Sequence, residues 1–150
     1  HEIEDESDVE KAQMIAEKIK PDVAIVTDVT HDTNTPMIDK IVQGDLACGK
    51  GPVLTYGPAV QNNLLKHIIA SAEKNNIPFQ RAAASRSTGT DTDAFAYSNS
   101  GVASALISLP LKYMHTTVES TSKEDVENVI KLIYGSLLDI EQDQDFRYFS

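Results

Sequence analysis

The segment Pro21-Asp-Val-Ala-Ile-Val-Thr-Asp-Val-Thr-His-Asp-Thr-Asn-Thr-Pro36 sets the architecture that we expect for this chain. Residues 23–27 are an apolar, β-branched run without alternation, which is typical of a central strand in a parallel sheet covered on both faces. Asp28 ends this run, and ligands of open α/β sheets bind beyond the carboxyl ends of such strands. More polar side chains follow at once, namely His31, Asp32 and Asn34. We therefore expect a metal or polar-substrate site here, with a turn capped by Asp28 as the alternative.

Composition and charge describe a globular chain with one core. Of its 150 residues, 41% are hydrophobic and 24% are charged. No apolar run approaches the length of about eighteen residues that spans a membrane. The net charge of −10 argues against nucleic acid or an anionic membrane as a partner, whereas clustered carboxylates could hold cations.

Two features bear on the cellular compartment. The acidic N-terminus lacks the cationic start and the apolar core of a secretory signal. Cys48 is the single cysteine, which excludes a disulfide framework and a thiolate zinc site and fits a reducing environment. We therefore expect a cytoplasmic location.

The periodicity of apolar residues predicts helices and strands that alternate along the chain. A capping box at Ser7-x-x-Glu10 opens the first helix, which Pro21 ends. A second box, at Thr121 or Ser122, opens the final helix, and the tail after residue 140 is expected to fray. The other predicted elements are a helix at 59–75, a short helix before Gly101, and strands at 53–56, 79–84 and 102–109, the last ended by Pro110. This order predicts one α/β domain with a mostly parallel central sheet flanked by helices.

Three motifs need an interpretation of their own. Gly44-x-x-x-x-Gly49-Lys50 matches the first part of a phosphate-binding loop, but Gly51 replaces the hydroxyl residue that binds magnesium and Pro52 follows where a helix should run. We therefore reject nucleotide binding there. His67 lies at the edge of an apolar helix face, where packing or one hydrogen bond is the expected role. The loop at residues 85–93 is dense in hydroxyls and acids, which indicates that something binds nearby.

Carboxylates and one histidine gather at the predicted strand ends. His115 and Glu119 lie on the loop after the 102–109 strand, just as Asp28 follows the first strand. Carboxylate oxygens and neutral imidazole are ligands for zinc or cobalt, and two such ions a few ångströms apart can share and activate one water.

Five blocks of sequence, in this order, form a specific pattern between about Ala12 and Leu138. They are Ala24-Ile-Val-Thr-Asp-Val-Thr-His-Asp-Thr-Asn-Thr-Pro36, Gly49-Lys-Gly-Pro52, Ile77-Pro-Phe-Gln80, Gly89-Thr-Asp-Thr92 with Gly101-Val102, and Ser108-Leu-Pro-Leu-Lys-Tyr-Met-His-Thr-Thr-Val-Glu119. Through these blocks the chain resembles the catalytic domain of the tetrahedral aminopeptidases, which are dinuclear metallopeptidases also known as glutamyl or deblocking aminopeptidases and as endoglucanase-like proteins. The resemblance implies a zinc-peptidase-like α/β fold.

The resemblance implies a site with two divalent metal ions, zinc or cobalt. It makes Asp28 the carboxylate ligand of one ion and His115 the imidazole ligand of the other. The family carries a Glu-Glu pair before the first helix, and its spacing places Asp5 in the position of the general base and Glu6 in that of a ligand. Asp5 is shorter than the usual Glu by one methylene, which changes the reach of the base.

Three residues are expected to surround these ligands without binding metal. They are His31, Thr90 and Asp91. We expect Thr90 or Asp91 to orient His115 or its loop by hydrogen bonding, as outer partners of metal-bound imidazoles commonly do. The alternative is a capped helix start at Asp91.

The resemblance also implies which part of the family's chain this is. The family's His-x-Asp motif, its metal-bridging Asp and a small β-rich assembly domain all precede the first matched position. Residues 1–150 are therefore expected to be the C-terminal part of the catalytic domain, with the upstream part and the assembly domain outside them. This chain alone is then expected to hold at most one ion weakly, because two or fewer ligands per ion fall short of the usual three or four.

The expected activity is hydrolytic removal of N-terminal residues from peptides by a water that two metals activate, with a homo-oligomer formed through the domain outside this chain. A non-catalytic binding or assembly subunit that keeps the fold with an incomplete metal site is the competing hypothesis. A glycan hydrolase is less favoured, because no pair of carboxylates is obliged to flank a sugar bond.

Overall fold

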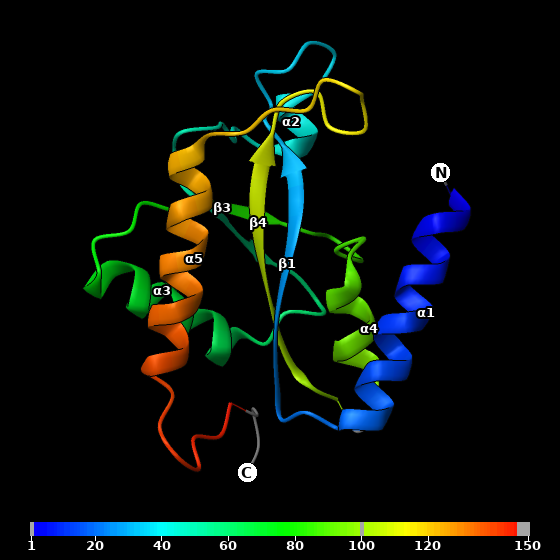
Figure 1. The fold of residues 1–150 in the computed structure, drawn as a ribbon, viewed down its shortest axis with the longest axis vertical. Coiled ribbons are helices and arrows are strands. Elements are labelled where there is room, and N and C mark those ends of the chain that lie inside the picture. The colour runs from blue at the N-terminus through cyan, green and yellow to red at the C-terminus, as the bar shows by residue number, and fades with distance from the viewer. Residues whose placement is uncertain (1, 100, 147–150) are drawn as a thin grey trace.

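The computed structural model describes residues 2–99 and 101–146, and within residues 2–9 it describes the backbone only. The described residues form five helices and four strands (Figure 1). The helices are α1 (Glu2–Ile19), α2 (Lys40–Gln43), α3 (Asn62–Lys74), α4 (Asp91–Tyr97) and α5 (Lys123–Leu138). The strands are β1 (Val23–His31), β2 (Val53–Tyr56), β3 (Gln80–Ala83) and β4 (Ala103–Leu111).

The four strands form one mixed sheet in the order β1-β4-β2-β3. β1 and β4 run parallel from the pair Val23 and Ala103 to the pair His31 and Leu111. β2 and β3 are also parallel to each other, and β2 meets β4 in the antiparallel sense over two residue pairs. The prediction of an α/β fold with a mostly parallel sheet is therefore confirmed, and β1 and β4 deliver their carboxyl ends to the same edge.

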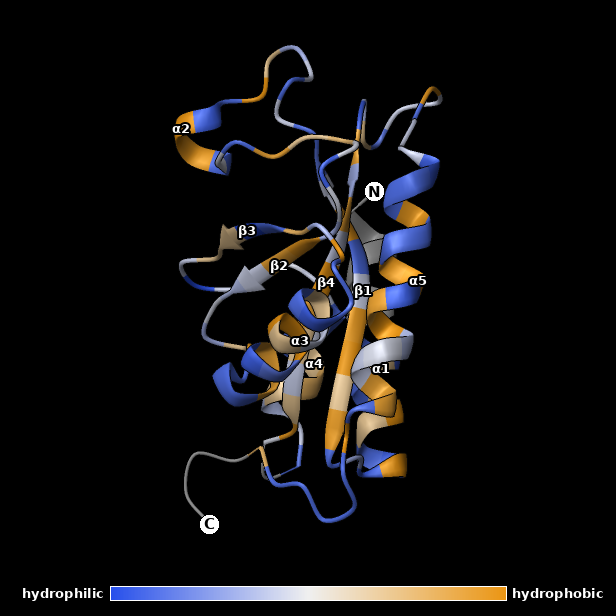
Figure 2. Cartoon of the chain, turned by 90° about the vertical axis from the view of Figure 1, so that its left-hand side faces the viewer, coloured by the Kyte–Doolittle hydropathy of each residue, from blue (hydrophilic) through white to orange (hydrophobic). Residues whose placement is uncertain are grey.

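Helices cover both sides of the β1–β4 pair (Figure 2). α5 lies on one side, α3 and α4 lie on the other, and α1 packs against α4 next to β1. None of the helices in the described part combines the length and apolar character needed to cross a membrane.

The lengths of the two long strands differ from the prediction. β1 continues through Asp28 to His31, and β4 continues through Pro110 to Leu111, because the two strands keep pairing to their ends. Pro110 is tolerated because β2 pairs with β4 only at Ile107 and Ser108, so the missing N–H of the proline has no ladder to interrupt.

Burial distinguishes these two strands. Nearly every residue of β4 is buried, as expected for a central strand, whereas most of β1 is half-buried or exposed. Within the described part of the chain β1 pairs with β4 alone, so β1 is an edge strand rather than the covered central strand that we predicted.

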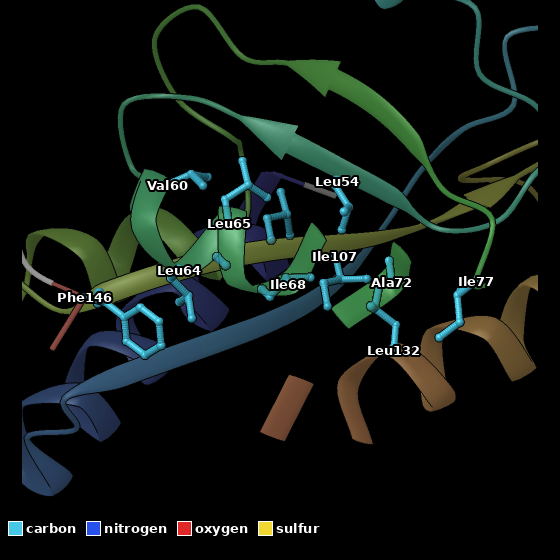
Figure 3. Close-up of a cluster of buried hydrophobic side chains, with 13 residues drawn as sticks. Leu54, Val60, Leu64, Leu65, Ile68, Ala72, Ile77, Ile107, Leu132 and Phe146 are labelled. Atoms are coloured by element: carbon cyan, nitrogen blue, oxygen red, sulfur yellow. The ribbon is translucent and has the colours of Figure 1, made fainter. Parts of the chain in front are cut away.

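The hydrophobic core lies between α3, α5 and the sheet (Figure 3). α3 turns its apolar face toward Ile107 of β4 and Leu132 of α5, and both of these side chains are fully buried. The α3 residues in this cluster are Leu64, Leu65, Ile68 and Ala72. The helical periodicity therefore identified the core-facing side of α3 correctly.

The C-terminal tail contributes to this core, contrary to the expectation that it frays. Phe146 is only 4% exposed and packs edge-on against His67, with ring centroids 5.4 Å apart. His67 also makes a 2.9 Å hydrogen bond between its Nε2 and the carbonyl oxygen of Ser136. The interpretation of His67 as a packing residue is therefore confirmed.

The first helix also starts earlier than predicted. α1 begins at Glu2 rather than at the capping box of Ser7, so Asp5 and Glu6 lie within the helix instead of before it. α1 packs on α4 through buried Ala12 and Ala16. Its larger apolar residues Ile15 and Ile19 stay exposed, because only a narrow stripe of small side chains meets α4.

Candidate metal and substrate site

A cavity of about 460 Å³ lies where β1, the loop before α4 and the loop after β4 meet. It is lined by Thr27, Asp28, Val29, Thr30, Thr88, Gly89, Thr90, Asp91, Met114 and His115. Four of the residues singled out from the sequence therefore converge on one cavity, although up to 87 positions separate them along the chain. Asp28 and His115 come together because each is delivered by one of two adjacent parallel strands.

Asp28 reaches the cavity from within β1, where it pairs with Ser108 of β4. Its side chain is half-buried, and Oδ1 accepts a hydrogen bond of 2.6 Å from the backbone N–H of Val29. The turn that we considered as its alternative role is not formed here, because the strand continues for three more residues. Asp28 is therefore a carboxylate on a rigid strand that faces a polar cavity.

His115 is carried by a closed loop between β4 and α5. Lys112 and Ser120 form an antiparallel bridge at its base, with backbone N···O distances of 2.8 and 3.2 Å. The hydroxyl of Thr121 donates a further hydrogen bond of 2.8 Å to the carbonyl oxygen of Pro110. These contacts tie the ends of the loop to the last residues of β4 and so fix where His115 can lie.

Glu119, on the same loop, accepts a hydrogen bond of 2.6 Å through its Oε1 from the backbone N–H of His115. It is not among the residues that line the cavity. The structure therefore gives Glu119 a local partner, where the sequence left it as a further possible ligand.

Threonine hydroxyls that bond to one another, in the loop before α4 and at its start, form another side of the site. Thr90 is the N-cap of α4, and its Oγ1 accepts from the N–H of Thr92 at 3.2 Å. It also lies 2.8 Å from the hydroxyl of Thr88 and donates to that of Thr92 at 3.0 Å. The capped helix start at Asp91 is therefore confirmed, with Thr90 as the capping residue. An orienting role of Thr90 or Asp91 toward His115 stays a prediction.

Asp93 holds the preceding turn of this loop. Its carboxylate accepts from the backbone N–H groups of Thr88 at 2.9 Å and of Gly89 at 3.0 Å. The loop that is rich in hydroxyls and acids is thus shaped by its own side chains, and one side of it faces the cavity.

Asp32 serves the loop after β1. It is only 1% exposed and accepts hydrogen bonds from the N–H of Asn34 at 2.8 Å and of Cys48 at 3.1 Å. Burial, the largest single influence, raises its pKa, but the bonds from Cys48 and Asn34 together outweigh it and leave the pKa below the usual value. Burial and the neighbouring Asp32 raise the pKa of the Cys48 thiol, so this thiol is kept protonated.

Asp125 is the residue whose role the sequence did not reveal. The capping box predicted at Thr121 or Ser122 would use Glu124 or Asp125 as its acid, but Ser122 makes no side-chain capping bond and Asp125 is fully buried. Its carboxylate instead accepts from the backbone N–H groups of Gly49 at 2.6 Å and of Gly51 at 2.8 Å. The Gly-Lys-Gly-Pro motif is a weak sequence signal of this contact: Gly51 is buried, and a buried backbone N–H group requires an acceptor.

The remaining predicted site residues lie elsewhere or outside the described side chains. Asp5 and Glu6 belong to α1, and their side chains are outside the part that the structure describes. His31 is the last residue of β1, opposite Leu111, and is not among the residues that line the cavity. Among the described residues, no group of three or more His, Cys, Asp or Glu side chains is gathered closely enough to hold a metal ion.

The sheet, with a polar cavity at the carboxyl ends of β1 and β4, is an α/β fold of the class expected, and comparison with known proteins confirms the resemblance. The family model of the M42 glutamyl aminopeptidases matches residues 2–132, so the chain belongs to this family.

Several proteins similar to this chain are described as aminopeptidases or peptidases. The chain is 35% identical to the lysyl aminopeptidase of Pyrococcus furiosus over 139 residues, which are 93% of this chain and 39% of that protein. The solved TET aminopeptidase of a Thaumarchaeota archaeon from marine sediment has a TM-score of 0.77 and 27% identity, covering 90% of this chain and 38% of its own. The TET1 peptidase of Pyrococcus horikoshii, described as assembling into a tetrahedron or a large octahedral shell, has a TM-score of 0.65 and 26% identity and covers 89% and 38%. The chain therefore spans about two fifths of the length of these relatives.

Proposed function

We propose that this chain contributes the Asp28 and His115 side of the active site in a metal-dependent aminopeptidase that removes N-terminal residues from peptides. The observation that carries the proposal is that Asp28 and His115, which the resemblance assigns to two different ions, line the same cavity. Membership of the M42 family supports the peptidase class. The acid-rich and hydroxyl-rich lining supports a polar ligand.

The donor set suits zinc or cobalt, because it combines a carboxylate with an imidazole. Asp28 would hold one ion and His115, together with Glu6, the other. When bound, the two ions lower the pKa of a water and polarise the scissile carbonyl. Asp5 would take a proton from that water and pass it to the nitrogen of the departing amine, so that the peptide bond is exchanged for a carboxylate and a free amine.

The described residues supply too few ligands for two closed sites. The proposed activity therefore belongs to a complete site with further ligands, in keeping with relatives more than twice as long as this chain. For the chain alone we propose one weakly held ion and no turnover.

Cobalt binding tests this proposal directly. Titration of the chain with Co²⁺, followed by absorption, should show weak binding that Asp28→Asn and His115→Ala each reduce, with His67→Ala as a matched control away from the cavity. Binding that none of these variants alters would refute the assignment of the ligands. Two tightly held ions with turnover of aminoacyl substrates would show that other residues complete the site.

An assembly role has separate support from an apolar tip formed by Met37, Ile41 and Val42. These side chains are 102%, 95% and 74% exposed. Ile41 and Val42 belong to α2 and Met37 precedes it, and Figure 2 shows α2 away from the sheet. Lys40 stabilises the segment that carries the tip, because its Nζ donates hydrogen bonds of 2.8 Å to Asn34 and to Asp45. We propose that a second copy of this chain packs against this tip, because a solved relative assembles into closed shells.

Light scattering of Ile41→Asp at high protein concentration checks this contact, with Ile19→Asp on exposed α1 as the control. We expect Ile41→Asp alone to lower the mass. Equal masses for both variants and the unchanged chain would contradict the assembly role of the tip.

A further inference from the structure

We infer that Glu119 is a positioning residue for His115, which it holds by the backbone without contacting metal or substrate. The inference rests on the proposed function, since it concerns a residue proposed as a metal ligand. It assigns Glu119 a role distinct from that of a ligand.

The first observation is the unusual backbone of His115. Its φ is +65°, in the left-handed region that residues with a side chain rarely adopt. Tyr113, two positions earlier, has a φ of +55°. Two such residues in one loop cost free energy, and such conformations persist only where the surroundings hold them in place.

The second observation is the group that holds this conformation. The Oε1 atom of Glu119 lies 2.6 Å from the backbone nitrogen of His115, which is a short distance typical of a hydrogen bond to an ionised acceptor. The hydroxyl of Thr116 donates a hydrogen bond of 2.6 Å to the carbonyl oxygen of Tyr113. The backbone of each residue with a positive φ, His115 and Tyr113, is therefore held by a hydrogen bond with a side chain of the same loop.

The third observation is the direction of these contacts. His115 lines the cavity, whereas Glu119 does not. The carboxylate of Glu119 binds the main chain of His115 and so determines where this residue lies. It does so without entering the cavity, where a metal ion or substrate would bind. The base of the loop is fixed independently by the Lys112–Ser120 bridge, so loss of Glu119 should loosen the tip of the loop only.

The experiment compares three substitutions at one position. Glu119→Gln keeps an acceptor oxygen at the same reach, Glu119→Asp keeps the charge but shortens the side chain, and Glu119→Ala removes both. Val118→Ala, at the exposed neighbouring position, is the matched control. Hydrogen exchange of the His115 amide, measured by NMR, reports the backbone contact, and a Co²⁺ titration reports the effect on metal affinity.

For Glu119→Ala and Glu119→Asp we expect faster exchange of the His115 amide and a metal affinity lowered about tenfold, which is the usual size of effects from groups that orient ligands. Glu119→Gln and Val118→Ala should stay close to the unchanged chain in both measurements. Unaltered amide exchange in Glu119→Ala would overturn the inference. A loss of affinity in Glu119→Gln with amide exchange unaltered would also overturn it, because Glu119 would then act as a ligand. If the unchanged chain binds no cobalt, the metal proposal fails, while amide exchange still decides whether Glu119 holds the loop.

Discussion

Replacing Asp125 by Ala tests a buried carboxylate that shapes the fold. Its fully buried carboxylate binds the N–H groups of Gly49 and Gly51 at 2.6 and 2.8 Å. Hydrogen bonds to a charged group contribute about 1.5–3 kcal/mol each, and their loss leaves two amides without an acceptor.

We therefore expect Asp125→Ala to lower the free energy of unfolding by about 3–5 kcal/mol, near the upper end for single substitutions. Asp125→Asn keeps one acceptor oxygen and should lose about half as much. Urea unfolding followed by circular dichroism gives these values, provided that the slope with urea is unchanged. Glu124→Ala, one exposed position earlier on α5, is the control. A loss for Asp125→Ala no larger than that for Glu124→Ala would refute the reasoning.

Three further substitutions have definite expected results. Gly51→Ala should prevent stable folding, because Gly51 has a φ of +88° and its new Cβ would overlap Pro78. Gly44→Ala, at a similar φ but in open space, should destabilise the fold far less, and thermal unfolding of the two variants compares these effects. Phe146→Ala should lower the free energy of unfolding by about 3–5 kcal/mol because it empties a core position, whereas Tyr134→Ala, at an exposed position, should lower it by less than about 1 kcal/mol. Similar urea midpoints for the two variants would show that the tail does not stabilise the core. Asp32 has a folded pKa below its ordinary value of 3.8, so the stability that it contributes is present above that value and is lost as the pH falls through the folded pKa. Asp32→Asn should therefore unfold with a weaker dependence on pH below about 4 than the unchanged chain, and an unaltered dependence in urea unfolding at pH 3 and pH 6 would contradict the assigned bonds.

The elements that local patterns specify were predicted well. The apolar period of α3 and the short β2 strand between glycine and proline breakers match the structure to within about three residues, which is the usual uncertainty of element ends. The convergence of Asp28 and His115 on one cavity was also predictable, because adjacent parallel strands end at one edge.

The features that the sequence did not reveal depend on distant contacts. The partners of Asp125 lie 76 and 74 positions away, so its burial could not be read from the turn in which it lies. The ends of β1 and β4 are set by their mutual pairing, which outweighs the propensities of Asp28 and Pro110 to stop a strand. Phe146 lies in the tail that was expected to fray, but its ring packs into the hydrophobic core.

The register of the β1–β4 pair has a consequence for how the chain folds. Every residue of β1 pairs with one located eighty positions later, as Val23 does with Ala103. Closing so large a loop is entropically costly, and contacts of this kind slow folding. During synthesis β1 leaves the ribosome long before its only described neighbour exists, with a nine-residue edge open to other chains. Rapid dilution at low protein concentration should therefore give a higher refolding yield than refolding at high concentration, because β4 must reach β1 before another molecule does.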